Sequence, residues 1–509
     1  MSDVLVVGAG PTGLTLALQA HALGAGVRVV ERRPEAFRRS RAMMVHSRTL
    51  EALRPLGVVD DLLARSDRTP AAELHLGHRV VRARLDDVAL RDTAYPHFTM
   101  VRQADVEEVL GAALAARGVP VERGVELVEA AANGEQARLT LVSGRGTEAT
   151  AATFVAGCDG PASTVRACAR IGWRGADHGE EVVLADVELA GDLEPGVLHA
   201  VPGSQGLVFV FALGEGASWR VLATRPVRDG TGAAYGQPGA AVPPGEVEQI
   251  LREAGLEVTV TDQPWSAAVR LQHRLADAFG HGRILLAGDA AHAHSPAAAQ
   301  GMNTGMLDAV NLGWKLALAE GDGPLLASYE AERRPVAGQV LGLTRAVFFA
   351  EASTHPLPRA LRGRLLPLLA PVLPPLVAER HLMAVVVWLL SQRWVRYRDS
   401  MLSVETVPGG PGPHPGDRLP DREVSSGGRR QRLHDLTARP GITVLLARAA
   451  PWPELGAPHV HVHRVEEWPG EGLVAVRPDG HVGLRSGDAD PGALTAWLSL
   501  AGVRDASVA

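Results

Sequence analysis

Residues 4–31 read VLVVGAGPTGLTLALQAHALGAGVRVVE and combine two short apolar runs with a glycine-rich segment. Residues 4–7 and 27–30 are rich in valine, which is typical of buried parallel strands. Residues 14–23, between them, are apolar nearly all round, as expected of a helix that packs on a sheet. The stretch therefore predicts a strand, a tight turn, a helix and a second strand that ends beside Glu31.

The predicted turn carries Gly8, Gly10 and Gly13 in a GxGxxG pattern. The first glycine permits the turn, the second lets a pyrophosphate approach the backbone, and the third allows close packing of helix and strand. Glu31 lies about 18 residues beyond Gly13, where a carboxylate accepts a ribose hydroxyl and repels a 2′-phosphate. The pattern therefore predicts a site for FAD or NAD and disfavours NADP there.

The composition of the whole chain is that of a globular protein. Of its 509 residues, 46% are hydrophobic and 21% are charged, and the formal net charge of −6 predicts no surface for nucleic acid. Cys158 and Cys168 are the only cysteines, which favours a reducing cytoplasm. The chain begins without a signal-peptide pattern, and prolines and charges interrupt the apolar stretch 365–390. We therefore expect a cytoplasmic protein without a membrane span.

The pattern of elements changes along the chain. Helical patterns occupy residues 48–56 and 106–117, and short β-type runs follow at residues 182–189, 207–213 and 219–224. Residues 283–287 again resemble a buried strand, and residues 306–320 a helix. A Pro/Gly-rich linker at residues 407–415 precedes further strands at 442–446, 473–476 and 481–484 and a helix at 491–500. This organisation predicts an α/β chain with a discontinuous Rossmann-like domain, an inserted antiparallel sheet and a small C-terminal α/β domain.

Several later segments carry motifs of their own. Residues 157–166 read GCDGPASTVR, residues 288–292 read GDAAH, and residues 300–312 read QGMNTGMLDAVNL. With Arg41, residues 48–51 (RTLE), Gln103 and Pro296, they resemble the signatures of the class A, single-component flavin monooxygenases, the aromatic hydroxylase family. Residues 416–418 (GDR) and 476–480 (VRPDG) resemble the thioredoxin-like third domain of its phenol and polyketide hydroxylase branch.

This resemblance implies three domains and a bound FAD. The expected domains are a discontinuous FAD-binding domain at 1–175 and 276–400, a substrate-binding sheet domain at 176–275, and a thioredoxin-like domain at 408–509. All FAD motifs lie upstream of the linker, so we expect the tail to serve packing or assembly and its removal to leave the flavin site intact. The residues expected to bind the cofactor are Gly8, Gly10, Thr12, Gly13, Glu31, Arg32, Arg41, Gln103, Asp159, Asp289, Pro296, Gly301, Met302 and Asn303.

The resemblance also implies a reaction. By this resemblance NAD(P)H would visit the flavin transiently, near the turn at Asp159, and the absence of a second GxGxxG unit from the chain agrees with that scheme. Dioxygen would add at flavin C4a, and the hydroperoxide would transfer one oxygen atom to an aromatic or polyketide-derived ring. The amino end of the helix after Gly301 would place a positive dipole near the reduced flavin. No general base is evident, and we expect a monomer or a homodimer.

The inserted sheet is expected to carry the substrate pocket. Phe209, Phe211 and Trp219 on the inserted sheet are expected to line the pocket, and His46 and Arg41 are weaker candidates. No metal site is expected, because His292 and His294 with Asp289 fit the flavin loop, and residues 459–463 alternate three histidines with valines as an edge strand would.

Three alternatives remain open: a Baeyer–Villiger oxygenase or epoxidase on the same scaffold, an FAD-dependent dehydrogenase or reductase, and a flavoprotein without turnover. One departure from the family supports the last. Relatives carry Gly-Gly before QGMN, whereas this chain has Ala298-Ala299. If either residue has a positive φ, alanine costs about 1–2 kcal/mol there.

Overall fold

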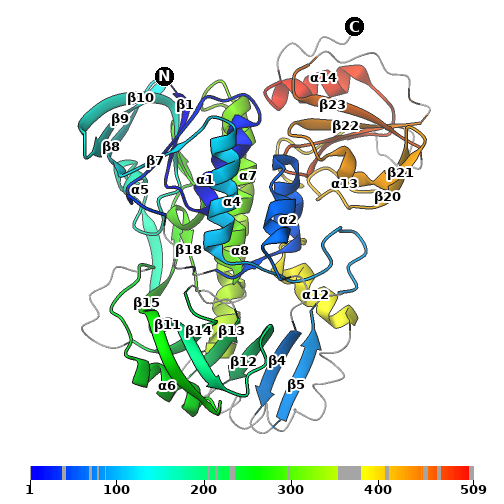
Figure 1. Ribbon diagram of the computed structural model, residues 1–509. Helices are drawn as coiled ribbons and strands as arrows, with labels where there is room; N and C mark the ends of the chain where they lie inside the picture. Colours follow the sequence, from blue (N-terminus) through cyan, green and yellow to red (C-terminus); the bar gives the residue numbers. More distant parts are fainter. Residues whose placement is uncertain are drawn as a thin grey trace.

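The structure is a computed structural model, and the residues it describes are 2–36, 40, 42–67, 71–76, 79–85, 88–202, 206–212, 216–227, 236–295, 299–352, 380–406, 412–448, 450, 457–466 and 472–503. Three of its sheets organise the chain (Figure 1). In the view of Figure 1 the first sheet lies at the upper left, the second at the bottom and the C-terminal sheet at the upper right.

The first sheet is parallel at its centre. Its order is β17-β10-β1-β2-β7, comprising β17 (Ile284–Leu286), β10 (Gly146–Gly157), β1 (Ser2–Val7), β2 (Val27–Glu31) and β7 (Val121–Arg123). Helix α1 (Pro11–His21) begins directly after Gly10, within the GxGxxG pattern, so it starts three residues earlier than the sequence predicts and Gly13 lies in its first turn. Because β17 enters from much later in the chain, this sheet is assembled from two separated segments. Two antiparallel extensions complete the sheet: β9 (Gln136–Ser143) pairs with β10 and with β8 (Val125–Asn133), and β16 (Gly280–His281) pairs with β17.

Two long helices, α7 (Gln300–Leu318) and α8 (Pro324–Ala352), run through the middle of the molecule (Figure 1). Helix α7 begins earlier than the sequence predicts and lies against α1. A Cβ placed on Gly313 would lie 2.8 Å from the Cβ of Gln19, so this glycine allows the two helices to approach closely. Three helices from earlier in the chain pack beside them: α2 (Ser47–Leu53) contacts α7, α4 (Gln103–Ala116) contacts α1, and α3 (Val59–Ala64) contacts α4.

The second sheet has the order β18-β15-β11-β14-β13-β12-β4-β5. Its strands are β18 (His292–Ala293), β15 (Val258–Ala276), β11 (Trp173–Gly191), β14 (Trp219–Pro226), β13 (Leu207–Phe211), β12 (Val197–Pro202), β4 (Ala71–Leu76) and β5 (Arg79–Arg84). All pairings are antiparallel except that of β12 with β4. Strands β4 and β5 come from outside residues 176–275, so the sheet is larger than the predicted insert. One face packs on α6 (Pro244–Glu253).

The C-terminal sheet has the order β19-β25-β24-β22-β23, with β24 antiparallel to both of its neighbours. Its strands are β19 (Val404–Glu405), β25 (Val482–Ser486), β24 (Leu473–Val476), β22 (Ile442–Ala447) and β23 (Val460–Val465). Helix α14 (Pro491–Leu500) packs on it through Trp497. Strand β23 carries His461 and His463 and lies at the edge of the sheet, where the sequence predicts it.

The remaining described elements are short. They are β3 (Met44–Val45), η1 (Arg54–Leu56), β6 (Thr99–Met100), α5 (Thr164–Cys168), η2 (Gly288–Ala290), α12 (Arg380–Leu390), β20 (Glu423–Ser426), β21 (Arg429–Arg432) and α13 (Leu433–Leu436). Among the described residues, no helix is both long and apolar enough to cross a membrane. Most of the apolar stretch 365–390 lies outside the described residues.

Buried charges join the C-terminal part of the chain to α7 and α8. Arg477 donates to both carboxylate oxygens of Glu332, at 2.8 and 2.7 Å, and Lys315 Nζ lies 2.8 Å from Glu332 Oε2. Burial lowers the pKa of Lys315 to about 8, although Glu332 opposes that shift. A second buried cluster pairs Arg418 with Glu51 at 2.6 and 2.7 Å. The tail therefore supplies counter-charges to the first domain. The prediction that removal of the tail leaves the flavin site intact does not take these contacts into account.

Candidate functional site

One cavity of about 420 Å³ extends from the glycine turn to the second sheet. Gly8 and Glu31 line it on one side, and Leu184, Phe209 and Leu222 line it on the other. The dinucleotide turn and an apolar sheet face therefore open into the same space.

The three glycines of the GxGxxG pattern differ in why a side chain is absent at each position. Gly8 has φ +103°, and a Cβ there would lie 2.4 Å from the Cys158 carbonyl oxygen. A Cβ on Gly13 would lie 1.9 Å from the Gly8 carbonyl oxygen. Gly10 has an ordinary φ of −78°, and a Cβ there would meet nothing within 4 Å. Neither backbone conformation nor protein packing requires glycine at position 10, so this residue keeps open a space that fits a bound pyrophosphate.

Glu31 ends β2 with its carboxylate at the turn. The Ala9 N–H donates to Glu31 Oε2 at 3.0 Å, and the Arg33 N–H donates to Oε1 at 2.9 Å. A carboxylate has about four lone-pair sites, so two remain for a ligand. Because Glu31 lines the cavity, its position fits a ribose hydroxyl. Arg32 and Gln103 also line the cavity.

Thr12 joins the turn to the later motifs. A Cβ on Gly288 would lie 2.6 Å from Thr12 Oγ1, and one on Gly305 would lie 2.4 Å from the same atom. Gly288 of the GDAAH motif and Gly305 of α7 therefore leave room for the Thr12 side chain of the first helix. Thr12 also lines the cavity.

The two aspartates of the later motifs differ in their contacts. Asp159 accepts hydrogen bonds from Ser163 Oγ at 2.6 Å and from the Thr164 N–H at 2.7 Å, so it caps the start of α5. Burial raises its pKa. Asp289 is half-buried, lines the cavity and makes no hydrogen bond within the described part of the chain. Its free carboxylate fits the predicted contact with ribityl hydroxyls.

The amino end of α7 faces the cavity. Gly301 and Met302 line it, and Ala299, the residue before the helix, has a left-handed backbone with φ +52°. Two nearby groups, His294 Nε2 and Ser295 Oγ, are buried, line the cavity and have no hydrogen-bond partner among the described residues. Buried polar atoms are rarely left unpaired, so these atoms also point to a ligand. Arg41, Pro296 and Ala298 lie outside the described residues.

Asn303 was expected to bind the cofactor, but its side-chain amide makes its hydrogen bonds within the protein. Its Oδ1 accepts from the His46 N–H and from Thr49 Oγ1, both at 2.8 Å, and its Nδ2 donates to the Met44 and Ala299 carbonyl oxygens at 3.0 and 2.9 Å. These four bonds use the whole capacity of the amide. Asn303 therefore holds β3 and α2 against α7, and neither it nor His46 is among the residues that line the cavity.

The aromatic residues of the second sheet divide between its two faces. Phe209 and Phe211 line the cavity, with ring centroids 5.8 Å apart. Trp219 was expected beside them but is buried with Val221 and Ala223 in the core on the opposite face. Successive side chains of a strand alternate between faces, so Trp219 lies on the face opposite Leu222 and Thr224, which line the cavity. Phe348 of α8 also lines the cavity and was not predicted.

His292, the last residue of the GDAAH motif, is held by buried charges, and His294 follows two residues later. His292 Nε2 lies 2.6 Å from Asp308 Oδ2, and Arg333 Nε donates to Asp308 Oδ1 at 2.7 Å. Burial opposes ionisation of Asp308, but Arg333 and His292 outweigh it and lower its pKa. Burial, with help from His292, lowers the pKa of His294. Burial raises the pKa of the Cys158 thiol well above its usual value, which disfavours the thiolate form.

Comparison with known proteins places these features in a family. The model of the FAD binding domain family matches residues 1–344. A 6-methylpretetramide 4-monooxygenase of Streptomyces rimosus is 37% identical over 433 residues, which cover 81% of this chain and 73% of that protein. Pentachlorophenol 4-monooxygenase of Sphingobium chlorophenolicum is 31% identical over 500 residues, covering 95% and 87%. The solved structure of OxyS anhydrotetracycline hydroxylase from Streptomyces rimosus matches with a TM-score of 0.72 at 29% identity, covering 94% of each chain. The predicted fold class is confirmed.

Proposed function

Because the chain belongs to the FAD binding domain family of FAD-dependent monooxygenases, we propose that it inserts one oxygen atom into an aromatic or polyketide-derived ring. NAD(P)H and dioxygen are the proposed co-substrates. The observation that carries the proposal is the shared cavity, in which the dinucleotide turn and an apolar sheet face line one continuous space.

The chain's own residues divide the task of holding the cofactor. Gly10 and Glu31 would hold the pyrophosphate and the adenosine ribose, and Asp289 would hold the ribityl chain. FAD supplies a ring that accepts a hydride from NAD(P)H and passes electrons to dioxygen. The amino end of α7, at Gly301, would stabilise negative charge on that ring through its unpaired N–H groups.

The sheet side of the cavity would bind and orient the ring substrate. Its lining is largely apolar and includes Leu184, Phe209, Phe211, Leu222 and Phe348. Such a wall binds a flat aromatic ring and displaces water from the place where oxygen is transferred. Both effects favour insertion of oxygen into the ring over its loss as hydrogen peroxide.

The test is NAD(P)H oxidation by FAD-loaded protein with a panel of hydroxylated aromatic and polyketide compounds. We expect a ring compound to accelerate oxidation and to gain one oxygen atom. Oxidation that continues without dioxygen, with another electron acceptor and no oxygenated product, would identify a reductase instead. Ring expansion or epoxide formation in the product would identify the alternative oxygen insertions.

Two variants at neighbouring positions test whether the ring compound binds in the cavity. Phe348 is 4% exposed and lines the cavity, whereas its neighbour Phe349 is 49% exposed. Phe348→Ala should raise KM for the ring compound, because truncating a buried aromatic contact weakens binding. Phe349→Ala should leave KM unchanged, and an equal effect of both changes would contradict the proposed pocket.

A further inference from the structure

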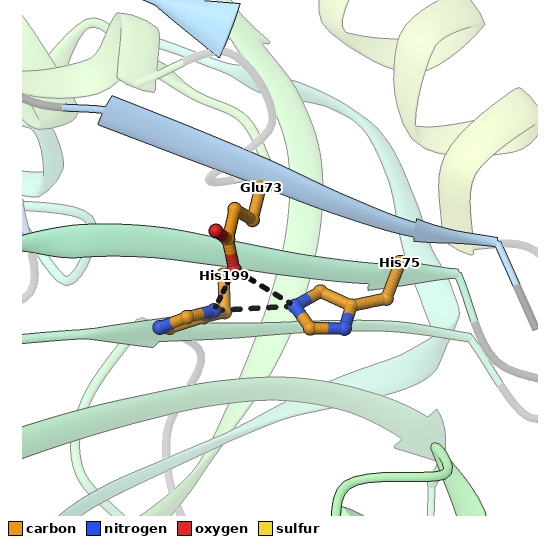
Figure 2. Close-up of side chains that lie close together, drawn as sticks. All are labelled: Glu73, His75 and His199. Carbon is orange, nitrogen blue, oxygen red and sulfur yellow. Dashed lines mark hydrogen bonds and ion pairs between the residues drawn. The ribbon is translucent and has the colours of Figure 1, made fainter. Parts of the chain in front are cut away.

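Three side chains with metal-binding atoms converge on the second sheet, away from the cavity. Glu73 and His75 lie on β4 and His199 lies on β12, with Glu73 and His199 as register partners (Figure 2). His75 Nε2 and His199 Nδ1 are 3.1 Å apart, His199 Nδ1 and Glu73 Oε2 are 3.3 Å apart, and His75 Nε2 and Glu73 Oε2 are 3.9 Å apart. One atom of each side chain therefore points toward a common centre.

These three distances match the edges of a metal coordination shell. Ligand atoms at about 2.0–2.2 Å from a tetrahedral zinc ion lie roughly 3.3–3.6 Å from one another. The observed separations bracket that value. Two imidazole nitrogens and one carboxylate oxygen are also a ligand set that zinc uses in proteins, with a water molecule in the fourth position.

The surroundings of His199 favour the same interpretation. His199 Nε2 lies 3.3 Å from the Glu194 carbonyl oxygen, and Nδ1 lies 3.3 Å from the Glu73 carboxylate. A neutral imidazole has one ring proton, so one of its two nitrogens must face an oxygen acceptor without a proton between them. A metal ion at the centre removes this conflict, because Nδ1 then donates its lone pair to the metal while Nε2–H donates to the carbonyl.

The outer contacts resemble those of a built metal site. Metal-binding histidines usually donate their other N–H to a carbonyl or carboxylate, as the geometry at His199 allows. The second oxygen of Glu73 lies 3.5 Å from Arg82 Nη1, and Arg82 is held in turn by Glu194 at 2.6 and 2.9 Å. These contacts orient both the imidazole and the carboxylate toward the centre.

The site is separate from the cavity but reachable from solvent. Leu198 lines the cavity, whereas the side chain of its neighbour His199 lies on the opposite face of the sheet, beside Trp219. The His199 side chain is 1% exposed, and those of Glu73 and His75 are each 17% exposed. An ion would therefore enter past Glu73 and His75.

We propose that Glu73, His75 and His199 bind a divalent transition-metal ion of the zinc type, with a water molecule as the fourth ligand. This proposal differs from the sequence-based expectation of no metal site. The ion would fasten β4 to β12 and so hold the β4–β5 hairpin on the sheet that forms the cavity wall. It has no part in the proposed oxygen insertion.

The test is a titration of tag-free, EDTA-treated full-length protein with Co²⁺, followed by displacement with Zn²⁺. We expect one Co²⁺ per chain with the visible absorption of a four-coordinate site, its loss on adding Zn²⁺, and no competition by Mg²⁺. His75→Gln and His199→Ala should each weaken binding by more than about 100-fold, because losing a ligand costs more than losing an outer contact, which costs about 10–100-fold. His463→Ala, on β23 of the C-terminal sheet, is the matched control and should bind normally.

Two outcomes would overturn the proposal. One is the absence of stoichiometric Co²⁺ and Zn²⁺ binding to wild-type protein, which would show that the three side chains are only a hydrogen-bonded cluster. The other is binding that is unchanged in His75→Gln and His199→Ala. FAD content and circular dichroism of each variant must match the wild type, and His75→Gln keeps the test valid if the more buried His199 variant does not fold.

Discussion

The backbone N–H of Ala9 donates a hydrogen bond to Glu31, with 3.0 Å between Ala9 N and Glu31 Oε2. This bond fixes the carboxylate at the end of β2 against the glycine turn. The same carboxylate lines the cavity, so one side chain both shapes the turn and faces the place proposed for the adenosine ribose.

Glu31→Arg should weaken FAD binding. It removes the proposed ribose hydrogen bonds, each worth about 1.5–3 kcal/mol when one partner is charged, and the acceptor of the Ala9 N–H. The dissociation constant can be measured by the quenching of FAD fluorescence on adding apoprotein. Glu35→Arg, at an exposed position a few residues later, is the control. Equal affinity of the Glu31 variant and the wild type would refute this assignment.

Ala299→Gly should stabilise the protein and change the outcome of its reaction. Ala299 has φ +52°, a conformation that costs alanine about 1–2 kcal/mol and glycine almost nothing. The greater entropy of unfolded glycine offsets about 0.4–1 kcal/mol of that gain. We expect a higher melting temperature, similar FAD affinity and a shifted ratio of product to hydrogen peroxide. Ala254→Gly, at a right-handed helix end, should instead lower stability.

If the melting temperature of Ala299→Gly falls as much as that of Ala254→Gly, the left-handed conformation carries no strain. An unchanged ratio of product to hydrogen peroxide would show that the Ala298-Ala299 departure from the family is neutral for oxygen chemistry.

The free energy of unfolding should decrease at acidic pH because His481 is buried. Burial lowers the pKa of His481 from 6.5 to about 4, although Asp479 opposes the shift and Arg48 and Arg477 reinforce it. The folded protein keeps this imidazole neutral, whereas the unfolded chain takes up a proton below pH 6.5. His481 therefore does not lower the free energy of unfolding above pH 6.5, but lowers it by about 3 kcal/mol as the pH falls to 4.

Urea unfolding at several pH values checks this contribution. His481→Gln should show a shallower loss of stability between pH 6.5 and 4 than the wild type. His414→Gln, whose side chain is 53% exposed, should follow the wild type. The same pH dependence in all three proteins would show that His481 is not responsible.

Arg477→Met should destabilise the protein strongly. Arg477 is fully buried and pairs with Glu332 and Asp479, so its loss leaves both carboxylates short of a counter-charge. Breaking such a pair costs about 3–5 kcal/mol. Arg430→Met removes an exposed pair with Glu423 in the same part of the chain and should cost about 0–1 kcal/mol. Similar melting temperatures of the two variants would contradict a structural role for the buried network.

Local patterns explain what the sequence could predict. Gly8, Gly13 and Glu31 lie within one strand–turn–helix–strand unit, so their spacing alone indicates the turn and its acid. The parity of Phe209 and Phe211 likewise places both rings on one face of a strand. Trp219 was misplaced because the register of β14 against its neighbours, which sets the face of each residue, depends on partners far away in the chain.

Contacts between distant segments explain what the sequence could not predict. Glu73 and His199 are close together only because β4 pairs in parallel with β12, which lies more than 100 residues later in the chain. Arg477 reaches Glu332 across 145 positions of sequence. No local spacing rule connects such residues, so the sequence does not indicate that Glu73 meets His199 or that Arg477 meets Glu332, although Arg477 lies within the VRPDG motif.

The most direct test of the central claim is the reaction of FAD-loaded protein with NAD(P)H and an accepted ring compound under ¹⁸O₂. If one cavity brings FAD and the ring together, mass spectrometry should find one ¹⁸O atom in the product and none when the label is supplied as H₂¹⁸O. A product without ¹⁸O, or NAD(P)H oxidation that yields only hydrogen peroxide with every compound tried, would contradict the account.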